Sequence, residues 1–183
     1  MESFEALREG IIDHLKRYAL STDGPFQLSS GGTSDWYLDG RQTTFSGEGG
    51  RLVGRCVGRM MDQGATAIGG LTMGADPVAV SVALLANRPL KAFSIRKQTK
   101  THGTGGRLVG PVGRGDKVVV VDDTTTTGAS LVEAVEVLRG EGIEVVQAIV
   151  VVDRSHGAAA AGVEAVGVPF AAVVGPEDLG LTG

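Results

Sequence analysis

Apolar residues recur along the first third of the chain at spacings that predict short helices and strands. Residues 3–19 repeat apolar side chains every three or four positions, which predicts an amphipathic helix, and Ser3 is suited to cap its start. Residues 48–63 show the same spacing and predict a second helix. Between the two helices, residues 26–28 and 36–38 look like short strands on either side of a turn.

From residue 65 onwards, short continuous runs of apolar residues alternate with helical patterns. Strands are predicted over 65–70, 91–95, 117–121, 145–152 and 170–174. Helices are predicted over 77–86 and 128–139. Runs that are apolar at every position are typical of parallel strands that are buried on both faces. The alternation of strands with helices therefore predicts an α/β fold, with a central and mainly parallel sheet that is flanked by helices.

The composition is typical of one folded domain. The chain has 183 residues, of which 42% are hydrophobic and 21% are charged, and this balance excludes a disordered chain. We expect a single domain over residues 1–183. Within it, residues 1–47 are expected to form an N-terminal helix and a small appendage, and residues 65–174 are expected to form the core.

Charge, cysteine content and hydropathy exclude several classes of protein. The net charge is −4, so no general positive field attracts nucleic acid. Cys56 is the single cysteine, which excludes an internal disulfide and a cysteine-based metal site. No apolar run approaches the ~18 residues that span a membrane. We therefore expect a soluble, cytoplasmic protein with no nucleic-acid or membrane partner.

The most specific group of polar residues stands between the predicted strand 117–121 and the predicted helix 128–139. It consists of Asp122 and Asp123, followed by four threonines and Gly128. Free backbone N–H groups and hydroxyls at a helix N-terminus favour a phosphate. The two carboxylates would repel a phosphate but suit the hydroxyls of a polyol, so a sugar phosphate satisfies both demands. The alternative is an ordinary strand–loop–helix in which Asp and Thr only cap the helix.

A basic segment follows the predicted strand 91–95. Its positively charged or titratable residues include Arg96, Lys97, Lys100 and His102, and three glycines follow within the next four positions. Such a loop can close over a polyanion and then withdraw. For any single one of these residues, a solvated surface loop is the simpler interpretation.

Together, these stretches resemble the orotate phosphoribosyltransferases, which belong to the type I phosphoribosyltransferase family. Residues 118–130 are similar to the family's signature for 5-phosphoribosyl 1-pyrophosphate (PRPP), and residues 96–110 are similar to its catalytic loop. Residues 26–39 resemble its N-terminal hood, and residues 69–77 resemble its pyrophosphate loop. Arg154 stands at the family's orotate-carboxylate position, which suits an arginine because its planar fork binds carboxylates. The resemblance covers nearly the whole chain and implies the type I phosphoribosyltransferase fold with a small hood.

The resemblance implies a Mg2+-dependent enzyme that transfers the 5-phosphoribosyl group from PRPP to orotate. The products are orotidine 5′-monophosphate and pyrophosphate, in the biosynthesis of UMP. Mg2+ is expected to be held mainly by PRPP and pyrophosphate, with a water-mediated contact to Asp122 or Asp123 rather than a direct one. The family also implies a homodimer in which the loop 97–106 is shared between subunits.

The resemblance also assigns roles to individual residues. The catalytic residues that it implies are Lys100, His102, Asp122 and Asp123. The PRPP-binding residues that it implies are Arg96, Lys97, Lys100, His102, Asp122, Asp123, Thr124, Thr125, Thr126, Thr127, Gly128, Ala129, Ser130, Thr72 and Met73. The orotate-binding residues that it implies are Thr126 and Arg154.

Two alternative functions and two departures from the family pattern stay open. A purine or uracil phosphoribosyltransferase would share the PRPP signature without needing the basic loop or Arg154. A regulatory protein that senses PRPP and binds nucleic acid would need a basic face or an added module, which the net charge of −4 disfavours. Some family members have lysine where this chain has Ser29 and Met73, so two positive charges are missing near the pyrophosphate and the base.

Overall fold

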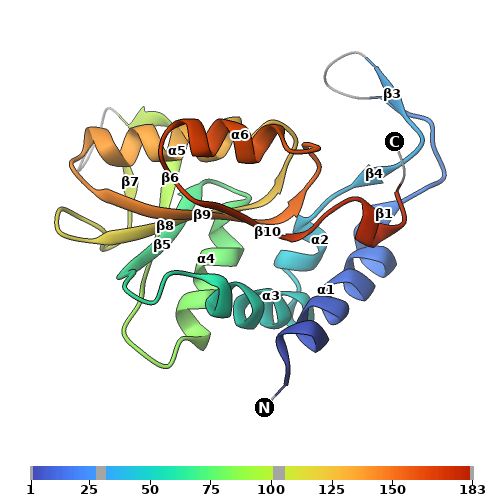
Figure 1. Ribbon diagram of the computed structural model, residues 1–183, viewed down its shortest axis with the longest axis horizontal. Coiled ribbons are helices and arrows are strands. Elements are labelled where there is room, and N and C mark those ends of the chain that lie inside the picture. Colours follow the sequence, from blue (N-terminus) through green and yellow to red (C-terminus); the bar gives the residue numbers. More distant parts are fainter. Residues whose placement is uncertain (1, 28–31, 101–105, 182–183) are drawn as a thin grey trace.

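A six-stranded sheet forms the centre of the computed structural model, which describes residues 2–27, 32–100 and 106–181, without the side chains of residues 99 and 100. The strands lie in the order β10–β9–β8–β5–β6–β7 (Figure 1). Their bounds are β5 (Ala67–Leu71), β6 (Lys91–Lys100), β7 (Gly106–Val109), β8 (Lys117–Thr125), β9 (Glu144–Asp153) and β10 (Phe170–Val174). Neighbouring strands are parallel except β6 and β7, which are antiparallel. The predicted α/β fold with a mainly parallel sheet is confirmed.

Helices cover both faces of this sheet (Figure 1). One face carries α1 (Phe4–Tyr18), α3 (Gly47–Met60) and α4 (Ala75–Leu85), and the other carries α5 (Ala129–Gly140) and α6 (Ala158–Ala165). Two clusters of buried apolar side chains form the core, one between the sheet and each helical layer, because the strands are apolar on both sides. Across the described ranges, no helix is long and apolar enough to cross a membrane. The cytoplasmic location stays a prediction, as does the division into residues 1–47 and 65–174.

The segment between α1 and α2 (Arg41–Thr44), residues 19–40, is called the hood below. Its described residues form four strands of two residues each, which are β1 (Leu20–Ser21), β2 (Phe26–Gln27), β3 (Thr33–Ser34) and β4 (Tyr37–Leu38). β1 pairs with β4 and β2 pairs with β3, both antiparallel. The two strands predicted in this segment therefore exist, but they do not pair across one turn, because each has a different partner.

Several element boundaries also differ from the prediction. β8 does not end at Val121 but continues to Thr125, because its last residues still pair with β9. β6 extends to Lys100, where it pairs with β7, a strand that the apolar pattern did not reveal. α6 and the short 3-10 helix η1 (Glu177–Leu179) were not predicted either. The acids that were expected to follow the strand therefore lie within it.

The chain reverses its order within the sheet between β5 and β8. β5 leads into α4 on one face, whereas β8 leads into α5 on the other (Figure 1). The two connections diverge from the carboxyl ends of neighbouring strands, and α/β proteins bind ligands in the crevice that such a divergence leaves. The fold therefore predicts a site at the ends of β5 and β8.

Candidate functional site

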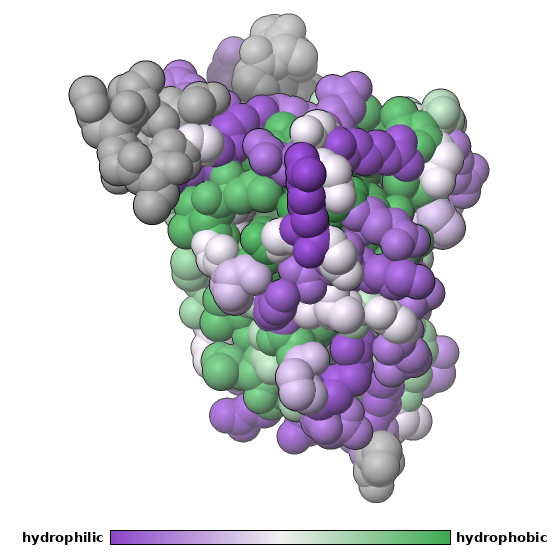
Figure 2. Space-filling model, turned by 90° about the vertical axis from the view of Figure 1, so that its left-hand side faces the viewer, coloured by the Kyte–Doolittle hydropathy of each residue, from purple (hydrophilic) through white to green (hydrophobic). Residues whose placement is uncertain are grey.

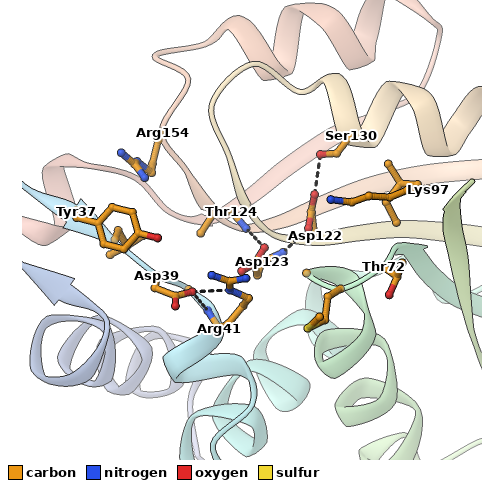
Figure 3. A pocket seen from close by; sticks show the side chains of 15 residues that line it. Tyr37, Asp39, Arg41, Thr72, Lys97, Asp122, Asp123, Thr124, Ser130 and Arg154 are labelled. Atoms are coloured by element: carbon orange, nitrogen blue, oxygen red, sulfur yellow. Dashed lines mark hydrogen bonds and ion pairs between the residues drawn. The ribbon is translucent and has the colours of Figure 1, made fainter. Parts of the chain in front are cut away.

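A cleft of about 670 Å3 opens at the carboxyl ends of β5 and β8 (Figure 3). The sheet and its connections line one wall with Leu71, Thr72, Met73, Gly74, Lys97, Asp122, Asp123, Thr124, Ser130 and Arg154. The hood and the start of α2 line the other wall with Tyr37, Leu38, Asp39, Gly40 and Arg41. The cleft thus lies where the divergence of β5 and β8 predicts a ligand.

Two buried carboxylates form the centre of the sheet wall. Asp122 accepts hydrogen bonds from the Ser130 hydroxyl at Oδ2 (2.6 Å) and from the main-chain N–H of Asp123 at Oδ1 (3.0 Å). Oδ1 of Asp123 accepts from the main-chain N–H of Thr124 (2.8 Å), while its Oδ2 accepts no hydrogen bond from the described residues. The local main chain and one hydroxyl therefore orient both carboxylates, and one oxygen stays available to a ligand.

Burial changes the ionisation of this pair. It raises the pKa of Asp122 to about 7, which the Ser130 hydrogen bond opposes and the neighbouring charge of Asp123 reinforces. Burial also raises the pKa of Asp123, against the main-chain hydrogen bond from Thr124. A cation or a hydroxyl-bearing ligand favours the charged form of the carboxylates, so binding of either in place of water stabilises this pair.

Two glycines let the main chain approach these carboxylates closely. A Cβ at Gly74, in the connection from β5 to α4, would collide with Oδ1 of Asp122 and of Asp123. A Cβ at Gly40 would lie 2.7 Å from Cγ2 of Thr124 and 3.2 Å from Oδ2 of Asp123. Both walls of the cleft therefore need glycine next to the acids, since a side chain would displace them.

A half-buried guanidinium lies at the end of β9. The main-chain N–H of Arg154 donates to the Thr125 carbonyl (2.8 Å), which fixes its position beside β8. Its guanidinium lies over the ring of Trp36, with 4.2 Å from Cζ to the ring centroid. Nε is buried and has no hydrogen-bond partner among the described residues, and burial lowers the pKa of the side chain. Because a buried charge is costly until it is paired, this site favours an anion.

The hood wall contains an ion pair that the sequence analysis missed. Nε of Arg41 donates to Oδ1 of Asp39 (2.7 Å), and this contact holds the pKa of Asp39 below its usual range. Tyr37 lines the same wall and is 42% exposed. The signal that pointed here was weak: an Asp-Gly-Arg triplet directly after a two-residue apolar strand.

The cleft brings together about half of the residues that the sequence analysis assigned to it. Those that line it are Thr72, Met73, Lys97, Asp122, Asp123, Thr124, Ser130 and Arg154. Those that are described but do not line it are Arg96, Thr125, Thr126, Thr127, Gly128 and Ala129. The Thr125 hydroxyl instead accepts from the N–H of Gly128 (2.8 Å), which shapes the turn before α5.

Several predicted residues lie outside the described part of the chain. They are the side chain of Lys100, His102 with the rest of residues 101–105 of the loop 97–106, and Ser29. Their roles stay predictions. Among the described residues, no three His, Cys, Asp or Glu side chains gather in a way that could hold a metal ion.

Sequence comparisons identify relatives along most of the chain. The model of the phosphoribosyl transferase domain matches residues 48–168. An orotate phosphoribosyltransferase of Corynebacterium glutamicum (strain R) is 45% identical over 175 residues, which cover 95% of this chain and 94% of the relative. An orotate phosphoribosyltransferase of Streptomyces coelicolor is 42% identical over 179 residues, which cover 96% and 98%.

Solved structures of similar proteins share the fold. The Mycobacterium tuberculosis orotate phosphoribosyltransferase in complex with Fe(III) dicitrate has a TM-score of 0.87 at 37% identity, covering 96% of this chain and 99% of that chain. The same enzyme in complex with PRPP has a TM-score of 0.83 at 36% identity, with the same coverage. An adenine phosphoribosyltransferase of Leishmania donovani, at 16% identity and a TM-score of 0.63, shares the fold alone.

Proposed function

The chain belongs to the phosphoribosyl transferase family and has orotate phosphoribosyltransferase activity, and we propose that the cleft at the ends of β5 and β8 carries out this reaction. The enzyme transfers the 5-phosphoribosyl group from PRPP to orotate. It forms orotidine 5′-monophosphate and pyrophosphate, in the biosynthesis of pyrimidine nucleotides. The rest of the proposal assigns parts of the cleft to parts of the two substrates.

The position of Arg154 is the observation that supports orotate as the base substrate. Orotate differs from uracil by one carboxylate, and Arg154 offers a half-buried guanidinium whose Nε has no partner among the described residues. A carboxylate that binds in the fork pairs this charge and accepts two parallel hydrogen bonds. Trp36 holds the guanidinium from one face, so its edge stays available to the ligand. Purines and uracil carry no carboxylate for this site.

The remaining parts of the cleft suit PRPP. The carboxylates of Asp122 and Asp123 accept hydrogen bonds from the ribose hydroxyls. The 5′-phosphate binds the segment 124–130, where the N-terminus of α5 and the hydroxyls of the preceding loop favour an anion. The pyrophosphate lies along the connection from β5 to α4, next to Thr72, Met73 and Gly74. Lys97 lines the cleft as well and adds positive charge.

Mg2+ fits the donor set of this cleft. Carboxylate oxygens are the hard ligands that Mg2+ prefers, and Oδ2 of Asp123 accepts no hydrogen bond from the described residues. We place Asp122 and Asp123 in contact with Mg2+ through water, while PRPP supplies most of its ligands. When bound, Mg2+ supplies positive charge to the leaving pyrophosphate.

In the reaction, the bond between C1′ and the pyrophosphate oxygen breaks, and a bond from N1 of orotate to C1′ forms on the opposite face. N1 gives up its proton, which the released pyrophosphate can take up. The ribose passes through a state with oxocarbenium character. Asp122 and Asp123 fix the ribose through its hydroxyls, and Arg154 and the predicted contact of Thr126 fix the base, so that N1 faces C1′. The loop that contains Lys100 and His102 closes over the pyrophosphate and excludes water. Lys100 supports the departing oxygen.

We propose a homodimer in which this loop reaches the neighbouring subunit. The loop leaves the sheet at β6 and β7, the strands at its edge. Apolar side chains on α4 are exposed, namely Val80, Leu84 and Leu85, and Figure 2 shows hydrophobic residues gathered along one flank of the molecule. Such exposure suits burial against a second copy. Mixed dimers of Lys100→Ala and Asp123→Asn subunits should regain activity that neither variant has alone; verified mixed dimers without activity would contradict the shared loop.

The proposed function is tested by incubating the protein with PRPP, Mg2+ and one of five bases: orotate, uracil, adenine, hypoxanthine and guanine. We expect orotate alone to be consumed, with pyrophosphate released in equal amount. Consumption of a purine or of uracil in place of orotate would identify another base specificity. Binding of PRPP without consumption of any base would indicate a regulatory protein.

A further inference from the structure

Arg41 lines the main cleft at the start of α2, yet none of the roles above uses it. Its Nε donates to Oδ1 of Asp39 at 2.7 Å, and its main-chain N–H donates to the same oxygen at 3.2 Å. Gln42 donates to the other oxygen of Asp39 at 3.3 Å. Asp39 therefore orients the guanidinium from its Nε edge. The two terminal nitrogens donate no hydrogen bond to the part of the chain that the structure describes.

Arg41 also borders a second hollow, of about 530 Å3, beside the main cleft. The residues that line this hollow are Asp39, Arg41, Gln42, Phe45, Ser46 and Met73. Asp39, Arg41 and Met73 line both cavities. Met73 belongs to the connection from β5 to α4, so Arg41 faces the same part of the cleft as this connection. Arg154 lines only the main cleft, where it lies over Trp36.

The connection from β5 to α4 contributes no positive side chain. The Thr72 hydroxyl donates to Oδ2 of Asp76 (2.7 Å), and Met73 is uncharged and 56% exposed. A diphosphate bound there carries several negative charges, and the nearby carboxylates of Asp122 and Asp123 repel it. A positive charge from another element is needed. Figure 3 shows the guanidinium of Arg41 between Asp39 and Asp123, in the cleft that this connection also lines.

We propose that Arg41 is a substrate-binding residue whose two terminal nitrogens contact the diphosphate of PRPP, and then the product pyrophosphate. The proposal rests on the proposed function, because it takes PRPP as the substrate. In this arrangement Nε of the guanidinium donates to Asp39, and the two terminal nitrogens donate to a phosphate, so all three nitrogens of the planar group have an acceptor. The start of α2 thereby contributes to the leaving group a positive charge that the β5–α4 connection lacks.

The direct test compares PRPP with ribose 5-phosphate, which lacks only the diphosphate. Affinities are measured by calorimetry with Mg2+ for the wild-type enzyme, Arg41→Ala and Arg41→Lys. We expect Arg41→Ala to weaken PRPP and pyrophosphate by about 10- to 100-fold, since charge-assisted hydrogen bonds are lost. Ribose 5-phosphate should change less than about threefold. Arg41→Lys should retain part of the affinity, because it keeps the charge without the fork.

A second variant moves the positive charge from Arg41 to the opposite wall of the cleft. Met73→Lys in the Arg41→Ala background should recover part of the PRPP affinity, because both positions line both cavities. Arg55→Ala, on α3, where Arg55 pairs with Glu2 at 3.3 Å, is the matched control and should leave PRPP binding unchanged. Equal weakening of PRPP and ribose 5-phosphate, unchanged PRPP affinity, or no recovery by the added lysine would overturn the proposal. Wild-type enzyme that binds PRPP but does not consume orotate would overturn the proposed function instead.

Discussion

Asp122 and Asp123, on the wall of the cleft that the sheet forms, are each 8% exposed, whereas Tyr37, on the wall that the hood forms, is 42% exposed. The sheet wall is held by long parallel strands, with β8 pairing to β9 as far as Thr125. The hood wall rests on strands of two residues each. Groups on the sheet wall are therefore fixed before the substrate binds, while groups on the hood wall depend on a few local contacts.

The two walls of the cleft carry groups with different functions. Groups that must meet the ribose within a fraction of an ångström lie on the rigid wall. Groups that select or hold the outer parts of the substrates are oriented from the hood, as Asp39 orients Arg41 and as Trp36 supports Arg154. Changes on the sheet wall should therefore reduce catalysis strongly, and changes on the hood should mainly reduce the affinity for one substrate.

Gly74→Ala is expected to have the largest effect on the sheet wall. Its Cβ would collide with the carboxylates of Asp122 and Asp123, so one of them must move. A displacement of about 1 Å near the reacting atoms can lower the rate about 100-fold, and we expect kcat/KM to fall at least that far. Gly47→Ala is the matched control, because nothing lies within 4 Å of its added Cβ. Steady-state kinetics with full activity in Gly74→Ala would refute the tight approach of this connection.

Asp122→Asn tests what the buried carboxyl costs in stability. Burial raises its pKa from 3.8 to about 7, so the folded protein keeps a proton that the unfolded chain has already lost between these values. The protonated Asp122 carboxyl therefore contributes to the free energy of unfolding below pH 3.8, and this contribution is lost as the pH rises through 7. The substitution should raise the free energy of unfolding at about pH 8 by roughly 2 kcal/mol, with little change near pH 4.

The check on this prediction is urea denaturation of the ligand-free protein at both pH values. Asp13→Asn, an exposed position on α1, is the control. An equal effect of Asp122→Asn at both pH values would mean that the carboxyl is not strained by burial. Asp122→Asn should also lose activity, so that the same substitution raises the free energy of unfolding and lowers the catalytic rate.

Trp36→Leu should have the smallest effect, because it alters the support of a binding group rather than the group itself. The ring lies 4.2 Å from Cζ of Arg154, and loss of such a contact costs about 1 kcal/mol. We expect the KM for orotate to rise about fivefold, with PRPP affinity and the free energy of unfolding nearly unchanged. Trp36→Phe should keep most of the affinity. A large loss of stability in Trp36→Leu would show that the hood is a structural element after all.

The sheet wall could be predicted from the sequence, since its signals are local. Continuous apolar runs indicated β8 and β9, and two acids followed by hydroxyls stood out beside them. The end of β8 was placed too early, because polar residues usually end a buried strand, whereas here pairing with β9 continues through Asp122 to Thr125. β7 was missed because its short run lies at the sheet edge, and α6 because alanine and glycine give no amphipathic repeat.

The hood wall could not be predicted in the same way. Strands of two residues have no periodicity, and the pairing of Leu20 with Leu38 joins positions far apart in the sequence. The place of Arg41 depends on that pairing and on Asp39, so no local pattern marked it as part of the cleft. Arg154 was identified through the resemblance to the family, which places it after a predicted strand, but its contact with Trp36 depends on the fold of the hood.

The most direct test of the account is the preference for orotate over uracil, measured as the ratio of their kcat/KM values in the wild-type enzyme and in Arg154→Ala. Uracil removes the carboxylate and the variant removes its partner, so the two changes should not add. We expect the wild-type enzyme to prefer orotate by at least about 100-fold, and Arg154→Ala to reduce this preference to about fivefold or less, with PRPP affinity unchanged. A variant that keeps the full preference for orotate would contradict the assignment of Arg154 and leave the choice of base to another part of the cleft.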